Sequence, residues 1–434
     1  MFRRVIAQRY GATFPQRSIA VIIELLKVGK GIATMIKDML ASRDVELLAG
    51  GDRTKLNTGI AKPIFDISAA VESALDAPRD FPPFASAMVP GDRIAIAVDS
   101  SIPKLNEVIH AVVDYLLKHG AELENISVVL SPCDAAVLDQ CRNQFPAELQ
   151  GKLACYMHQP EQPGELGYLA ATEEDASPIY INRRLLEADL VLPISCYRAS
   201  SSIAYSGVSG ISPLFADNET IKHYSSLTQL GSKADQIKRR EDAEQTSWLL
   251  GIQCILQVCP AGHGNIASFL VGTPGAVKKE SDNEIASRLS IAPQAPCDVV
   301  IAAIDGGVNE QTWQNVARAL YLAKSLVKNK GTIVILSHLK ISPSSSLRRL
   351  TGLESAATIE KQLAKDYQLD TLAASLLAEY SPNCRICLQS DLNAEELEDL
   401  GIAPINSEQQ IEKILPVQGR TLWIPAAQYR GFDS

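Results

Sequence analysis

Residues 93–134, RIAIAVDSSIPKLNEVIHAVVDYLLKHGAELENISVVLSPCD, hold two short apolar runs on either side of an amphipathic segment. RIAIAVDSS and ISVVLSPCD are rich in β-branched residues and end in polar ones, which predicts two buried strands. LNEVIHAVVDYLLKHG has apolar residues at helical spacing and a glycine stop, which predicts a helix. Strand, helix and strand in this order favour a parallel sheet with helices on its faces.

The same alternation continues along the chain. NRRLLEAD predicts a helix and ADLVLPIS a strand, and a second series follows in CDVVIAAIDGG, the helical WQNVARALYLAKSLVKNKG at 313–331, and GTIVILSHL. The segment SIAPQAPCD has the composition of a connector and places a boundary near 285–295. We therefore expect an α/β fold of two α/β domains with mainly parallel sheets facing a central cleft. Their expected ranges are 61–290 and 291–434, after a helical N-terminal extension at 1–60.

Charge and cysteine usage narrow the class of protein. The formal net charge is -9 over 434 residues, which disfavours binding to nucleic acid phosphates. Nine scattered cysteines, without a cleavable apolar leader, predict reduced thiols in a cytoplasmic protein. Charged residues interrupt the apolar N-terminal run, so we expect no transmembrane segment. That run is expected to pack on its own domain or on a partner subunit, which leaves a homo-oligomer open.

Ligands of open α/β sheets bind beyond the carboxyl ends of the strands. The polar strand ends are therefore the expected lining of one interdomain cleft. They are Asp99–Ser101, Ser131–Asp134, the loop 196–226, Asp305–Gly307 and Ser337–His338.

The order of several segments resembles the nickel-pincer-nucleotide lactate racemase family. INRRLLEADLVLPIS, the Ser-Gly loop YSGVSGISP and ADNETI are similar to the family's N-R/K-x-x-x-E-A-D stretch, glycine-rich loop and T-I pair. The similarity runs colinearly over about residues 60–415. The resemblance implies racemisation or epimerisation of a 2-hydroxy acid, with nickel held by a pincer nucleotide that is tethered to a loop lysine.

Most of the family's catalytic positions carry other residues in this chain. The two histidines that serve as acid and base fall on Ala135 and Ser200, and the tethering lysine falls on Ser209 or Gly210. The nickel-binding histidine falls on Ser225, while His223 stands two residues earlier. The resemblance therefore predicts a diverged member in which the nickel-pincer nucleotide is not bound covalently and the standard reaction does not run.

At the family's substrate-binding positions, this chain has more residues of similar chemistry. Asp99 matches the start of the family's D-x-x-R, although the arginine position is Ile102. Arg318 falls on a substrate-binding lysine, and Asn315 on a glutamine one helical turn earlier. A guanidinium binds a carboxylate through two parallel hydrogen bonds, so the resemblance implies a small-anion site that uses these residues.

Three functions remain open from the sequence. The first is a diverged 2-hydroxy acid racemase, with His223 as the candidate catalytic residue. The second is a non-catalytic protein that binds a small anion or nucleotide. Its backbone cradle would be the Ser-Gly loop, with the candidates Ser200, Ser206, Gly207, Ser209 and Gly210. The third is an enzyme of different chemistry that uses His223, Asp99 or Cys133. No metal ligand set is predicted.

Overall fold

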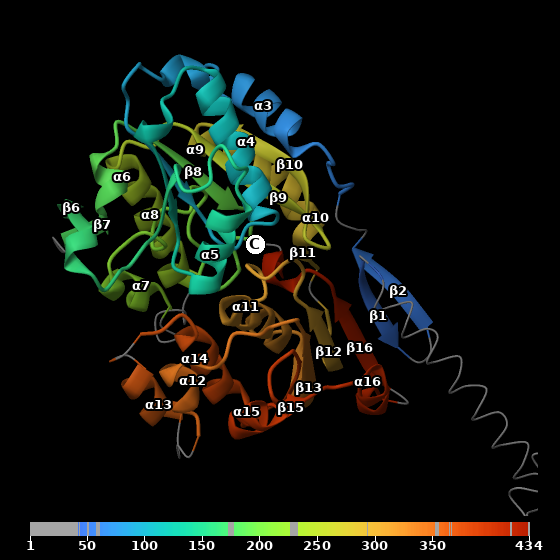
Figure 1. Cartoon of the computed structure of the whole chain (residues 1–434). Helices are drawn as coiled ribbons and strands as arrows, with labels where there is room; N and C mark the ends of the chain where they lie inside the picture. Colours follow the sequence, from blue (N-terminus) through green and yellow to red (C-terminus); the bar gives the residue numbers. More distant parts are fainter. Residues whose placement is uncertain are drawn as a thin grey trace, which may run out of the picture.

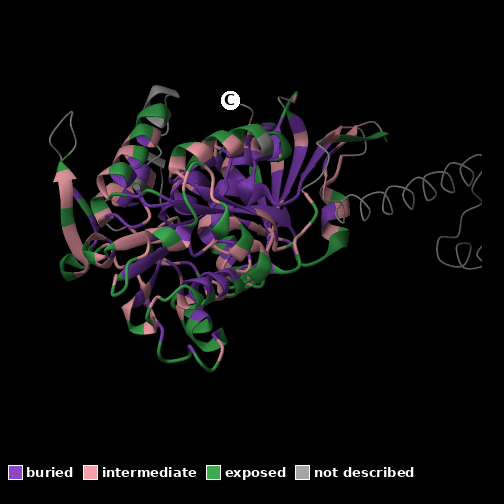
Figure 2. Ribbon diagram, turned by 90° about the horizontal axis from the view of Figure 1, so that it is seen from above, coloured by how far each residue is buried: buried purple, intermediate pink, exposed green. Residues whose placement is uncertain are grey.

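Two sheets of mainly parallel strands form the cores of two domains in a computed structural model of the chain (Figure 1). The structure describes residues 42, 44–49, 52–57, 61–171, 178–225, 233–292, 294–351, 356–363, 365, 367–416 and 419–432. Buried residues concentrate in the strands, and exposed residues lie on the outer faces of the helices (Figure 2). The expected fold class is confirmed.

The upper domain in Figure 1 is built on a six-stranded sheet with the order β10-β9-β8-β3-β4-β5. Its strands are β3 (Ile94–Val98), β4 (Ile126–Leu130), β5 (Ala154–Met157), β8 (Leu190–Cys196), β9 (Ile255–Gly262) and β10 (Asn265–Gly272). Only β10 runs antiparallel, to β9. The helices are α3 (Ile67–Asp76), α4 (Leu105–Lys118), α5 (Ala135–Gln144), α6 (Arg183–Glu187), α7 (Asn218–Ser225), α8 (Lys233–Leu249), α9 (Pro274–Glu280) and α10 (Ala286–Leu289).

The lower domain has a seven-stranded sheet with the order β15-β14-β13-β12-β16-β1-β2. Its strands are β12 (Cys297–Ala303), β13 (Val327–Leu336), β14 (Arg385–Gln389), β15 (Ala403–Pro404), β16 (Arg420–Ile424), β1 (Val45–Ala49) and β2 (Asp52–Asn57). Its helices are α11 (Trp313–Lys324), α12 (Ser345–Arg348), α13 (Ala356–Leu363), α14 (Thr371–Tyr380), α15 (Ala394–Asp399) and α16 (Glu408–Ile414). No helix in the described ranges is long and apolar enough to cross a bilayer.

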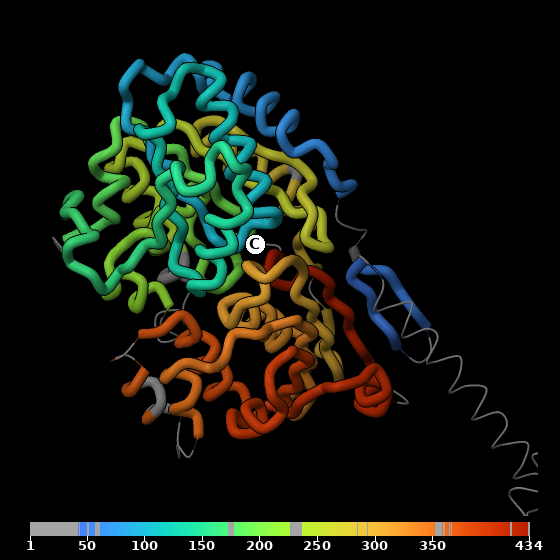
Figure 3. Tube along the Cα trace, viewed as in Figure 1, coloured from blue at the N-terminus to red at the C-terminus, as the bar shows by residue number. Residues whose placement is uncertain are grey.

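The hairpin β1–β2 differs from the helical extension expected for residues 1–60. Strand β1 pairs antiparallel with β16 and brings Val45 into the core of the C-terminal domain, and Figure 3 shows the blue hairpin beside the red segment that contains β16. Glu46 is fully buried and forms an ion pair with Arg53 of β2. The pairing of β1 with β16 joins segments far apart in the sequence, so helical periodicity upstream does not indicate it. Most of the expected helical extension lies outside the described residues.

The helix expected at 313–331 is shorter in the structure. Helix α11 ends at Lys324, and residues from Val327 onward already belong to β13. Val327 pairs with Cys297 of β12, so strand pairing overrides the helical propensity of the lysine-rich segment.

The two domains are joined by several segments of the chain. Residues 61–66 run from the lower sheet to α3, and the chain returns between α10 and β12. Near the C-terminus, Ala426 and Tyr429 pack in the core of the N-terminal domain. The Asn309 side chain also donates hydrogen bonds to the carbonyls of Ser100 (3.0 Å) and Ile102 (2.8 Å). The carboxyl ends of strands from both sheets are thereby held facing each other.

The packing of β1 yields a test by substitution. Val45→Asp would bury a carboxylate without a partner, which costs at least about 3 kcal/mol. We expect a clearly lowered melting temperature by circular dichroism, whereas Lys55→Ala on the exposed neighbouring strand should leave it nearly unchanged. Equal melting temperatures for wild type and Val45→Asp would show that β1 is not part of the domain core.

Candidate functional site

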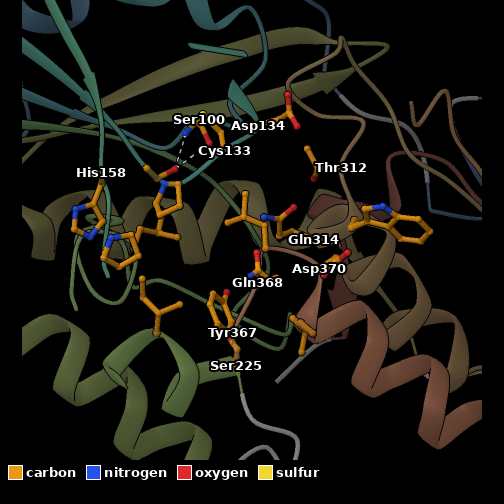
Figure 4. Close-up of a pocket in the computed structure, with 18 of the residues that line it drawn as sticks. Ser100, Cys133, Asp134, His158, Ser225, Thr312, Gln314, Tyr367, Gln368 and Asp370 are labelled. Carbon is orange, nitrogen blue, oxygen red and sulfur yellow. Dashed lines mark hydrogen bonds between the residues drawn. The ribbon is translucent and has the colours of Figure 1, made fainter. Parts of the chain in front are cut away.

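A cavity of about 660 Å³ lies between the strand ends of the two domains. The N-terminal domain contributes the ends of β3 and β4 with Ser100 and Cys133, and the C-terminal domain contributes the start of α11 with Thr312 and Gln314 (Figure 4). The Ser100 amide donates to the Ser131 hydroxyl across these two strand ends (3.0 Å). The cavity lies where an open α/β sheet places its ligands, and its volume is typical of small-molecule sites.

Asp99 lines this cavity, but its carboxylate is already engaged by protein groups. One oxygen accepts from the amide (3.0 Å) and the hydroxyl (2.8 Å) of Ser101. The other accepts from Arg198 at 2.5 Å, and both side chains are almost fully buried. Burial opposes ionisation, yet the Arg198 guanidinium holds the pKa of Asp99 below its ordinary value. Asp99 therefore neutralises Arg198, a residue that the sequence did not single out.

Arg318 and Asn315 are brought together as expected from their spacing. Arg318 donates to the Asn315 side-chain oxygen (2.7 Å), and the Asn315 amide donates to the carbonyl of Glu310 (2.7 Å). Arg318 lines the cavity with only 8% of its surface exposed, and its Nε has no hydrogen-bond partner within the described residues. Burial and the nearby Arg198 charge lower the pKa of Arg318 to about 9, so it stays protonated at neutral pH.

Tyr367 and Ser225 meet across the cavity from the two domains, as Figure 4 shows. The Ser225 hydroxyl hydrogen-bonds the Tyr367 phenol, whose pKa is nevertheless raised because burial disfavours the phenolate. The Arg318 charge also acts on this phenol. Tyr367 lies between helices α13 and α14 and carried no sequence signal, because only the fold brings it to α7.

Among the described residues, one histidine lines the cavity. The sequence did not single out this histidine as a candidate. His158 follows β5, where its Nε2 donates to the carbonyl of Ala216 (2.8 Å) and its Nδ1 accepts from the amide of Asn182 (3.0 Å). Burial lowers the pKa of His158 to about 4. The ring is therefore neutral, and both nitrogens are used inside the protein.

The histidines singled out from the sequence lie elsewhere. His223 is exposed on α7 and packs edge-on against the ring of Tyr224, while its helix neighbours Ile221 and Ser225 line the cavity. His338 is also exposed and does not line the cavity, and the same holds for His263, which the sequence did not single out above.

The Ser-Gly loop packs mainly against the protein interior. The Ser209 hydroxyl hydrogen-bonds the Ser247 hydroxyl of α8 (2.5 Å), and Ser206 is buried. Gly207 and Gly210 have φ values of +69° and +71°, and a Cβ on Gly210 would lie 3.1 Å from the Ser195 Cβ. These glycines are required by backbone conformation and close packing.

The cavity face of the loop is apolar. Pro213 and Leu214 line the cavity, whereas the candidate residues Ser200, Ser206, Gly207, Ser209 and Gly210 do not. Ser200 instead accepts a hydrogen bond from Arg240 through its carbonyl (2.5 Å).

Cys133 lines the cavity as a neutral thiol. Burial raises its pKa to about 12, and its sulfur contacts that of Met157 at 3.7 Å. A reactive cysteine needs a positive neighbour that lowers its pKa, so the geometry does not favour Cys133 as a nucleophile.

The donor groups around the cavity do not fit a nickel-pincer nucleotide. The described residues contain no cluster of three His, Cys, Asp or Glu side chains that could hold a metal ion. The imidazole of His158 has no free nitrogen, and the loop 206–213 has no lysine. Lys222 lines the cavity from α7 but pairs with Glu219 at 2.9 Å.

Comparison with known proteins agrees with this architecture. The family model described as the lactate racemase N-terminal domain matches residues 45–236. The lactate racemase apoprotein from Thermoanaerobacterium thermosaccharolyticum superposes with a TM-score of 0.68 at 14% identity, covering 90% of this chain and 100% of that one. A structural-genomics protein from Thermotoga maritima gives 0.62 at 12% identity, with coverages of 87% and 100%. No curated protein matches by sequence. Residues 45–236 thus match the lactate racemase N-terminal domain, and the chain shares the fold of the lactate racemase apoprotein.

Proposed function

We propose that this chain binds a small carboxylate anion of the 2-hydroxy acid class in the cleft between its domains, and that Arg318 holds the carboxylate. The observation that carries the proposal is the buried Arg318 guanidinium, which lines the cavity and leaves its Nε without a hydrogen-bond partner among the described residues. An unsatisfied buried donor costs about 1–3 kcal/mol, and more when it is charged. A bound carboxylate would satisfy it.

The surrounding charges support an anionic ligand. Asp99 pairs directly with Arg198, and Arg318 forms no ion pair with a carboxylate in the described part of the chain. The guanidinium is a planar fork that matches a carboxylate. Asn315 fixes the orientation of this fork through the Nη1 hydrogen bond.

We further propose that the chain does not carry out nickel-dependent racemisation. The resemblance puts Ala135 and Ser200 in the places of the acid and base, and the imidazole of His158 is held neutral with both nitrogens engaged. Removal of one positioned acid or base costs about 10²–10⁴ in rate. A non-catalytic binding role accounts for a retained anion site beside substituted catalytic positions.

A nucleotide is the second candidate ligand. It is favoured by the cavity volume of about 660 Å³, which exceeds the need of a three-carbon acid and lies in the range of sites for larger ligands. A cytoplasmic location also belongs to the proposal, supported by nine cysteines that are all free thiols.

Arg318 variants test the anion site. With L-lactate as the probe, Arg318→Ala should weaken binding about 10- to 150-fold, since charged hydrogen bonds contribute about 1.5–3 kcal/mol. Arg318→Lys should fall between wild type and Arg318→Ala, because it keeps the charge and loses the fork. Dissociation constants would be measured by isothermal titration calorimetry.

The matched control is Arg385→Ala, which removes an exposed guanidinium on β14 of the same domain and should not change lactate affinity. Circular dichroism would confirm that each variant is folded. Unchanged lactate affinity in a folded Arg318→Ala protein would refute the proposed site.

The second test concerns racemisation. We expect that purified protein supplied with the nickel-pincer nucleotide and L-lactate produces no D-lactate above a protein-free control in a chiral chromatographic assay. A competent lactate racemase in the same assay is the positive control. D-lactate formation that depends on this protein would contradict the proposal.

A further inference from the structure

Four ionisable side chains form a buried group beside the cavity. Asp99 and Glu310 are acidic, Arg198 and Arg318 are basic, and none exposes more than 8% of its surface. Arg198 interacts electrostatically with each of the other three. When all four are ionised, their charges sum to zero.

The two carboxylates have different environments. Asp99 has a guanidinium as a direct hydrogen-bond partner. Glu310 has none: one oxygen accepts from the Tyr429 hydroxyl and the other from the Gly307 amide (2.9 Å). A buried carboxylate without a cationic partner is costly. Glu310 is therefore the acidic group of the four that most readily accepts a proton.

Close packing keeps water away from Glu310. A Cβ added to Gly306 would lie 1.9 Å from its carboxyl, and the backbone of Gly306 approaches Gly264 of the N-terminal domain closely. Burial accordingly raises the pKa of Glu310 to about 7, with the Tyr429 hydrogen bond opposing the rise. Its charge state can therefore change within the physiological range.

Other titratable groups lie close to Glu310 in the described part of the chain. Tyr429 on the 3-10 helix Ala427–Tyr429 stays a neutral donor, because burial raises its pKa well above the ordinary value. Burial likewise keeps the Cys196 thiol neutral by raising its pKa. Asp305 acts on Glu310 from the same loop, accepts from the His263 amide (2.5 Å), and is near the buried cation Arg430.

A ligand carboxylate at Arg318 would add one negative charge to this neutral group. Water cannot screen the excess, because the side chains are buried and the local dielectric constant is low. Proton uptake by Glu310 restores neutrality. Few contacts separate the ligand from Glu310. Arg318 donates a hydrogen bond to Asn315, and Asn315 donates one to the carbonyl of Glu310.

We propose that the cleft takes up a monocarboxylate together with one proton, which is accepted by Glu310. This inference rests on the proposed function, because it requires the anion to bind at Arg318. The direction of the pH dependence follows from the linkage between binding and protonation. Above the pH range where Glu310 ionises, anion binding requires the uptake of a proton. The affinity for the anion therefore falls by up to about tenfold per pH unit as the pH rises. Below that range Glu310 is already protonated and affinity is independent of pH.

The experiment measures L-lactate affinity of the full chain from pH 6.0 to 8.5, and proton uptake in a weakly buffered solution at pH 7.5. Lactate stays ionised throughout this range, and neutral lactamide serves as the ligand control. We expect a fraction of a proton to one proton taken up per lactate bound, and none with lactamide.

Glu310→Gln fixes the neutral state while it keeps hydrogen-bonding atoms for Tyr429 and Gly307. It should bind lactate without proton uptake, with about wild-type affinity at pH 6.0 and up to about 30-fold tighter than wild type at pH 8.5, roughly 1.5 pH units above the pKa of Glu310. A merely structural role would not produce tighter binding. Glu398→Gln, on the exposed face of α15, should behave as wild type.

The outcomes separate the two proposals. Lactate binding that depends on Arg318 but shows no proton uptake and no change with pH would overturn the role of Glu310 and leave the anion site standing. Absence of lactate binding at concentrations up to about 50 mM, well above a dissociation constant of about 1 mM, would overturn both proposals. Weaker binding by Glu310→Gln at pH 8.5 would also overturn the inference.

Discussion

The buried ion pair of Asp99 and Arg198 sets the electrostatics of the interdomain cleft. It joins the end of β3 to the segment after β8, so two neighbouring strands of one sheet supply opposite charges at the same edge. A buried pair of this kind adds little net stability, because desolvation offsets the attraction. As a result, Asp99 is satisfied by Arg198, and Arg318 lines the cavity without an ion-pair partner among the described residues. The proposed anion site depends on this arrangement.

Much of the fold could be predicted from local patterns. The strand ends at Asp99 and Ser131 and the helix face of Asn315 and Arg318 lie in segments whose periodicity is strong, and the structure brings them to one cavity. The β1–β2 hairpin could not be predicted this way. Its place depends on pairing with β16, more than 300 residues later, and pairing between distant segments leaves no periodic signal in either one.

Several residues of the candidate site also could not be predicted from local sequence patterns. Arg198, His158, Tyr367 and Glu310 came from the structure alone, because each acquires its role from a partner in another element. Conversely, His223 and the Ser-Gly loop attracted interest by residue type, but α7 turns His223 outward and α8 engages Ser209. Residue type suggests a chemistry, while burial and hydrogen-bond partners decide whether a side chain is available for it.

We propose that the cleft keeps an anion site without the donors for a nickel-pincer nucleotide. Elemental analysis of the purified native protein, combined with mass spectrometry under native and denaturing conditions, tests it most directly. We expect no stoichiometric nickel and no covalent nucleotide-sized adduct, and we expect any co-purifying small molecule to be an anion that is released on unfolding. Stoichiometric nickel together with a nucleotide-sized adduct would contradict it.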